Sequence, residues 1–279
     1  MDRLVAEIRR GNCVAFIGAG FSAPSVQGWV PLLQSLASSV GPGTHEQVVR
    51  LTDSNPTSKN LEAAAQILKD DIGAEAFSQA LKSVMPAPPF AEMQQRLNLL
   101  KGIPFRSVLT TNFDGILPGI PIGRDAYQQV LRPSGHRWWD ERFWKSERGP
   151  EVVHLHGNVE AAEGVVFTRS DYRRRIYSSP GYTTFLRAVM STTTVLYLGF
   201  SFTDAYLDEL RSEVLALLDY EGGDTPIAYA LLHGVGADEI AYARSHEGIE
   251  VIPYSADSGH EEFDEFLAAL HDRTNPKAI

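Results

Sequence analysis

Short runs of apolar residues recur along the chain, with stretches of helical spacing between most of them. These runs cover residues 14–17, 107–110, 152–155, 195–198, 227–232 and 249–254. Runs of four to six residues that lack a clear alternation with polar residues are typical of strands buried on both faces of a sheet. The pattern therefore predicts six strands that lie inside the protein.

Several of the remaining segments repeat apolar residues at the spacing of an amphipathic helix. Leu4 and Ile8 show this spacing at the start of the chain, and residues 207–217 and 263–270 show it near the end. Buried strands that alternate with such helices favour an α/β fold, a Rossmann-like doubly wound parallel sheet. In this kind of sheet, ligands bind at the carboxyl ends of the strands.

Two intervals between expected strands are longer than one crossover helix requires. Residues 41–100 contain three helical stretches separated by glycine and proline, and we expect a helical insertion there. Residues 119–150 form a second, aromatic-rich insertion that holds three of the four tryptophans. This second insertion is either a small satellite core or a lid or subunit contact. Residues 1–279 are expected to form a single domain around one sheet.

Composition and charge exclude several classes of protein. Cys13 is the only cysteine, so the chain cannot build a disulfide or a metal site of several thiolates by itself. The net charge of -10 does not attract duplex nucleic acid or anionic lipid. The longest apolar stretch is far shorter than the roughly 20 residues of a membrane span, and no signal peptide opens the chain. We expect a cytoplasmic protein that contacts neither nucleic acid nor membrane directly.

A glycine-rich loop follows the first expected strand. Residues 18–23 read Gly-Ala-Gly-Phe-Ser-Ala, which fits the G-x-G-x-x-G/A pattern that brings backbone close to a pyrophosphate. A tight strand–helix turn would account for the glycines equally well. Dehydrogenases of this fold also place an acidic residue about 20 positions later, but no Asp or Glu lies between Glu7 and Glu46. The loop therefore indicates a dinucleotide and argues against ordinary hydride transfer.

Polar residues also follow the next three expected strands. Asn112 and Asp114 follow the second strand, where they either face a ligand or stabilise a turn. His156 follows the third strand and is either a buried, hydrogen-bonded histidine or a general base, since histidine titrates near neutral pH. A glycine–serine loop, residues 199–204, follows the fourth strand. Because these strand ends meet at one edge of the sheet, we expect one cleft.

Taken in order, these four segments resemble the sirtuin superfamily. The family's GAGxS loop, (Q/T)NxD segment, catalytic His-Gly and GxS loop match residues 18–22, 111–114, 156–157 and 199–201. Protein-deacylating sirtuins carry a four-cysteine zinc module, which a chain with only Cys13 cannot build. The similarity is therefore to the zinc-free SIR2-like group of bacterial anti-phage defence, which the Thr-Arg-Ser-Asp-Tyr segment at residues 168–172 also resembles.

This resemblance implies an NAD⁺ hydrolase that cleaves the nicotinamide–ribose bond, with NAD as substrate and neither zinc nor another metal. It implies that Asn112 positions the attacking water and that His156 acts as base. The resemblance assigns dinucleotide binding to Gly18, Ala19, Gly20, Phe21, Ser22, Asp114, Gly199, Phe200, Ser201 and Asp204. The products would be nicotinamide and ADP-ribose.

Members of that group often act as oligomers or beside a HerA-like ATPase or an Argonaute-type sensor. The chain ends soon after its last expected helix, so we expect no sensor domain of its own and an activity gated by a homo-oligomer or such a partner. NAD depletion in abortive infection is the implied outcome. Two other functions stay open. One is a non-catalytic NAD or ADP-ribose sensor or scaffold, which would need neither Asn112 nor His156, and the other is a zinc-free deacylase.

Overall fold

The structure is a computed structural model that describes residues 1–23, 25–86, 90–121, 130, 152–159, 165–178, 180–202, 205–221, 225–257 and 260–275. Its strands form one parallel sheet in the order β3-β4-β2-β1-β5-β6-β7. They are β1 (Cys13–Ile17), β2 (Ser107–Thr110), β3 (Ile120–Pro121), β4 (Val152–His154), β5 (Thr194–Leu198), β6 (Ala228–His233) and β7 (Ile249–Tyr254). The predicted α/β parallel sheet is confirmed. Because β1 pairs with β2 on one side and β5 on the other, the strand order reverses at β1.

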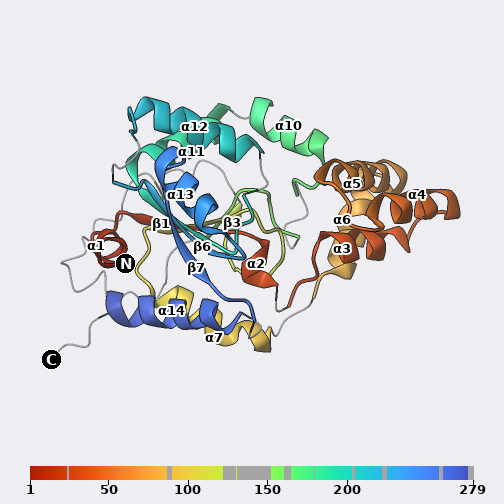
Figure 1. Cartoon of the computed structure of the whole chain (residues 1–279). Coiled ribbons are helices and arrows are strands. Elements are labelled where there is room, and N and C mark those ends of the chain that lie inside the picture. The colour runs from red at the N-terminus through yellow and green to blue at the C-terminus, as the bar shows by residue number, and fades with distance from the viewer. Residues whose placement is uncertain are drawn as a thin grey trace.

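Helices cover both faces of the sheet, which explains the continuous apolar runs (Figure 1). Along β1, Ala15 faces one hydrophobic core and its neighbour Phe16 faces the other. The first core is closed by α1 (Asp2–Arg9), α7 (Gln94–Gly102) and α14 (Glu261–Thr274). The second core is closed by α10 (Arg169–Ser178), α11 (Pro180–Thr192), α12 (Ala205–Leu217) and α13 (Ala237–His246).

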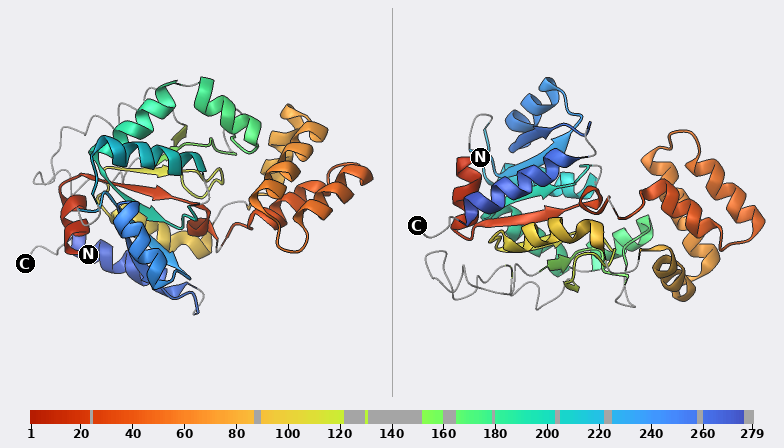
Figure 2. Two further views of the ribbon diagram at one scale, coloured as in Figure 1. Left: turned by 45° about the horizontal axis from the view of Figure 1, so that its top comes forward. Right: turned by 90° about the horizontal axis from the view of Figure 1, so that it is seen from below.

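Four helices form a separate unit with its own core beside the sheet, which Figure 2 shows on the side toward which β1 points. They are α3 (Trp29–Ala37), α4 (Pro42–Thr52), α5 (Ser58–Ile72) and α6 (Ala74–Val84), and we call them the helical unit. The last three lie within residues 41–100. Helix α3 shares their core although it precedes residue 41, because Leu33 and Leu36 pack among the same apolar residues. Helix α7, which follows η1 (Ala91–Met93), instead packs against α14 beneath the sheet.

Most of the predicted aromatic-rich insertion, residues 119–150, lies outside the described residues. Within it, residues 120–121 form the short edge strand β3, and Val130 is buried in the second core. A strand of two residues that includes a proline leaves no apolar run to recognise. Among the helices that the structure describes, none is long and apolar enough to cross a membrane.

Candidate active site

The loop after β1, which leads into the short helix α2 (Ala19–Ser22), packs directly on the loop after β5. The Gly20 N–H donates to the Gly199 carbonyl oxygen at 2.8 Å. Gly199 has a φ of +62°, and a Cβ atom placed there would lie only 2.2 Å from the Phe21 backbone nitrogen. A Cβ at Gly18 would lie 2.6 Å from the Gly199 oxygen. Glycine is required because two main chains meet without room for side chains.

Asn112 is fixed against the first of these loops. Its side-chain amide nitrogen donates to the Gly18 carbonyl at 3.1 Å and to the Ser22 hydroxyl at 3.0 Å. Its backbone N–H donates to the Thr110 hydroxyl at 3.0 Å, and the residue is 6% exposed. Since the amide nitrogen faces the glycine loop, the amide oxygen is the atom oriented to accept a hydrogen bond from another group.

Asp114 lies in a buried polar layer behind Asn112. It accepts a hydrogen bond from the Ile116 N–H at 3.0 Å and another from the Ser22 hydroxyl, and it is 4% exposed. Burial raises the pKa of Asp114, although these hydrogen bonds and the nearby His154 oppose the rise. Ser22 therefore connects the Asn112 amide to a carboxylate.

The two histidines at the end of β4 lie in different environments. His154 is fully buried, and its ring nitrogens lie 3.1 Å from the Asn112 carbonyl oxygen and 2.8 Å from the Leu117 carbonyl oxygen. His156 is half-buried, and its ring packs edge-to-face on Tyr172 of α10 at a centroid distance of 5.5 Å. His154 therefore supports the main chain of Asn112, whereas His156 lies beyond the strand end and is oriented by α10.

The other residues assigned to the dinucleotide divide between a cleft and the core. Gly20, Gly199, Phe200 and Ser201 line a cleft of about 900 Å³. Ala19 is exposed beside it. Phe21 is fully buried, and its ring packs on Phe263 of α14 at 6.2 Å, so only its main chain faces the loop. Asp204 lies outside the described residues.

Residues at and after the ends of β6 and β7 form the far wall of the cleft, and they were not predicted from the sequence. His233 and Tyr254 end these strands with ring centroids 5.4 Å apart. Asp238 and Glu239, in the first turn of α13, also line the cleft, and no Lys or Arg is among its described lining residues. The signal that would have found them is their place at the carboxyl ends of predicted strands. Within the described ranges, no group of three His, Cys, Asp or Glu side chains is arranged to hold a metal.

Comparison with known families adds an independent observation. A family model described as a SIR2-like domain matches residues 106–252, just over half of the chain. The chain belongs to the SIR2-like domain family. The suspected resemblance is therefore confirmed at the level of the family. The matched range contains Asn112, Asp114, His156 and Gly199, whereas the first glycine loop precedes it and is brought to it by the pairing of β1 with β2 and β5.

This SIR2-like chain is also similar to curated proteins named NAD(+) hydrolase ThsA. The protein of Enterococcus faecium is 26% identical over 225 residues, which cover 77% of this chain and 42% of that protein. The protein of Cytobacillus dafuensis is 22% identical over 252 residues, 89% of this chain and 47% of that protein. The protein of Bacillus cereus is 24% identical over 215 residues, 75% and 41% of the two chains. The matched SIR2-like region thus spans less than half the length of these relatives.

Proposed function

We propose that this SIR2-like chain is an NAD⁺ hydrolase that releases nicotinamide and ADP-ribose. The observation that carries the proposal is the hydrogen bonding of the Asn112 amide to Gly18 and Ser22, which fixes a polar side chain against a glycine loop suited to a pyrophosphate. The names of the curated relatives support the same activity. A module that only binds NAD has no need of this fixed amide or of the half-buried His156 that follows β4.

The dinucleotide would lie across the two glycine loops at the point where the strand order reverses. Its pyrophosphate would face Gly20 and Gly199, which both line the cleft. Its nicotinamide ribose would lie toward Asn112 and His156, at the ends of β2 and β4. Its adenosine half would then extend over β5 to β7, into the cleft of about 900 Å³.

Bond cleavage would leave the electron pair of the C1′–N bond on the nicotinamide nitrogen and a positive charge on the ribose. Fixed dipoles and charges that favour this cation lower the barrier. The Asp114 carboxylate would supply negative charge, and Ser22 would connect it to Asn112. The Asn112 oxygen would accept a hydrogen bond from a water molecule, which adds to C1′ as His156 accepts its proton.

We propose further that hydrolysis takes place in the cytoplasm and depletes NAD during phage infection. It would be switched on by self-association or by a partner such as a HerA-like ATPase or an Argonaute-type sensor. The reason is that uncontrolled hydrolysis would consume a cofactor that the host itself requires. Specific activity is then expected to rise with protein concentration or on addition of the partner. Full activity of an isolated monomer, unchanged by dilution, would contradict this control.

Chromatography of NAD, nicotinamide and ADP-ribose tests the reaction itself. Asn112→Ala and His156→Ala are each expected to lower the rate of nicotinamide release by about 10²- to 10⁴-fold. Asn98→Ala on α7 and His45→Ala on α4 are matched controls, since both residues are exposed and neither lines the cleft, and they should retain wild-type rates. Calorimetric binding of NAD without release, at every protein concentration, would instead support a non-catalytic sensor.

A further inference from the structure

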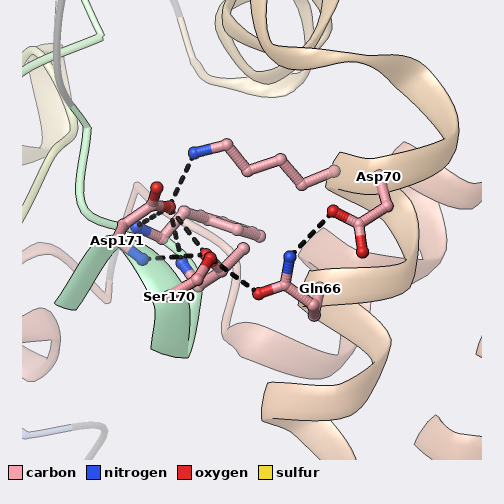
Figure 3. Close-up of polar contacts among 7 residues, drawn as sticks. Gln66, Asp70, Ser170 and Asp171 are labelled. Carbon is pink, nitrogen blue, oxygen red and sulfur yellow. Dashed lines mark hydrogen bonds and ion pairs between the residues drawn. The ribbon is translucent and has the colours of Figure 1, made fainter. Parts of the chain in front are cut away.

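Asp171, near the start of α10, collects hydrogen bonds from two parts of the fold (Figure 3). Its Oδ2 atom accepts from the Lys69 ammonium at 2.6 Å, the Thr168 hydroxyl at 2.8 Å and the Thr168 N–H at 3.0 Å. The Lys69 and Asp171 side chains are only 19% and 11% exposed. Burial alone would raise the pKa of Asp171, but the hydrogen bonds from Lys69 and Thr168 lower it below its ordinary value. The carboxylate is therefore held ionised beside a partly buried cation.

Two short routes lead from Asp171 to His156, one to its ring and one to its main chain. The first is the next residue, Tyr172, whose ring meets the His156 ring edge-to-face at 5.5 Å and 85°. The second is the main chain before α10, where the Phe167 N–H also donates to Asp171 Oδ2 at 3.3 Å. The adjacent Val166 N–H donates to the His156 carbonyl at 2.8 Å. Both the side chain and the main chain of His156 thus rest on the turn that Asp171 holds.

Lys69 belongs to α5, so this contact joins the helical unit to α10. Gln66, one turn earlier on α5, accepts a hydrogen bond from the Ser170 hydroxyl at 2.9 Å, as Figure 3 shows. Aromatic packing adds to this contact between the helical unit and the segment before α10. The ring centroid of Phe167 lies 5.0 Å from that of Phe77 of α6 and 5.7 Å from that of Phe113. Phe113 separates Asn112 from Asp114 in the chain. The helical unit therefore packs on Phe113, next to Asn112, and on Phe167, in the turn before α10 that Asp171 holds.

We propose that Asp171, held by Lys69, is a positioning residue that orients His156 for proton transfer, so that turnover depends on how the helical unit is seated. This inference rests on the proposed NAD⁺ hydrolysis. Removal of the Lys69 cation leaves the Asp171 carboxylate without its partner in a partly buried place. The turn at Thr168 then loosens, and Tyr172 no longer holds the His156 ring. The glycine loops and the adenosine side of the cleft lie elsewhere, so substrate binding is retained.

The test compares Lys69→Met, Lys69→Arg and Glu62→Gln in the full chain, with kcat and KM for NAD measured while circular dichroism shows each protein folded. Lys69→Met is expected to lower kcat by about 10- to 100-fold with little change in KM, because small errors of placement cost this much. Lys69→Arg should restore most of kcat. Glu62→Gln is the matched control, since Glu62 pairs with Arg169 between the same two helices at 3.6 Å and both side chains are exposed. It should leave both constants unchanged.

An NMR measurement separates this inference from the proposed reaction. The ring ¹⁵N and ¹H signals of His156, assigned by their loss in His156→Gln, should shift in Lys69→Met and stay in place in Glu62→Gln. Unchanged His156 signals in Lys69→Met, or an unchanged kcat with only a lower melting temperature, would overturn the positioning role. An equal loss of kcat in Glu62→Gln would also overturn it. A wild-type protein that turns over no NAD would contradict the proposed function alone, because the NMR signals would still report on His156.

Discussion

At the residue scale, the Ser22 hydroxyl joins the side chains of Asn112 and Asp114, which both lie far from Ser22 in the sequence. It accepts a hydrogen bond from Asn112 and donates one to Asp114. Such a chain of hydrogen bonds polarises its members, and its energy differs from the sum of isolated pairs. The buried carboxylate is the costly member, because burial disfavours its charge. This cost should make the free energy of unfolding depend on pH.

Asp114→Asn is expected to stabilise the fold at neutral pH while it lowers activity. Burial raises the pKa of Asp114, so ionisation of this group costs folding free energy. The cost is absent below the ordinary carboxyl pKa of about 3.9 and is complete above the raised pKa of the folded state. Urea unfolding from about pH 4 to about pH 8 should therefore show the variant gaining stability relative to wild type as pH rises. A difference that does not change with pH would contradict this reading.

The residue types at the strand ends were predictable because the motif is local. Asn112, His156 and both glycine loops each follow an apolar run directly. The burial of Phe21 was not predictable, because it depends on how the short helix α2 turns its side chains toward α14. The contact between Lys69 and Asp171 joins residues 102 positions apart, and no periodicity in either segment indicates it.

At the element scale, α7 and α14 support the first glycine loop from below the sheet, where Figure 1 shows them side by side. Arg96 of α7 donates to the Phe21 carbonyl oxygen at 2.7 Å, at the far end of that loop. The same guanidinium makes two bonds to Asp264 of α14, at 2.6 and 2.8 Å, and lies 4.6 Å from the Phe263 ring centroid. One buried side chain thus fixes α2 to two helices of the lower layer.

Arg96→Lys is expected to destabilise the fold by about 1–3 kcal/mol, since buried groups lose hydrogen bonds. An ammonium cannot reproduce the planar fork that meets Asp264 and Phe21 together. Arg187→Lys is the control, because Arg187 forms an ion pair with Glu213 at 2.7 Å on the surface, and such pairs contribute at most about 1 kcal/mol. Urea unfolding of both variants measures the difference. Equal losses of unfolding free energy in the two variants would show that Arg96 contributes no more to stability than a surface arginine.

The order of elements was largely predictable at this scale. Strands buried on both faces are continuously apolar, so β1, β2, β5, β6 and β7 were expected within one or two residues of their observed bounds, and β4 ends one residue early. Strand β3 was missed because Ile120 and Pro121 form no run. The packing of α3 in the core of the helical unit was not expected, because the apolar face of this helix does not indicate which core it joins.

At the scale of the whole molecule, the net charge of -10 has a local counterpart in the cleft. The cleft extends from the glycine loops across the ends of β6 and β7 to α13. Its described charged residues other than histidine are Asp238, Glu239 and Glu247, which are all acidic. An adenosine half placed there would bring its ribose toward carboxylates, where an additional phosphate is unfavourable.

The chain is therefore expected to prefer NAD to NADP by about tenfold or more in kcat/KM, since like charges in contact are strongly disfavoured. Asp238→Lys should reduce that preference by converting repulsion of the 2′-phosphate into attraction. Asp53→Lys, at the end of α4 and outside the cleft lining, is the control for a change of net charge alone. Steady-state kinetics with both dinucleotides measures the ratio. Equal kcat/KM for NAD and NADP in wild type would show that the acidic residues of the cleft do not select against NADP.

The most direct test of the proposed site is a crystal structure of the His156→Ala variant with intact NAD. We expect the pyrophosphate on Gly20 and Gly199, the nicotinamide ribose beside Asn112 and the adenine in the cleft that Tyr254 lines. This arrangement would place the bond that breaks next to the fixed amide. NAD bound in the reverse direction, or outside the two glycine loops, would contradict the proposed site and the hydrolysis assigned to it.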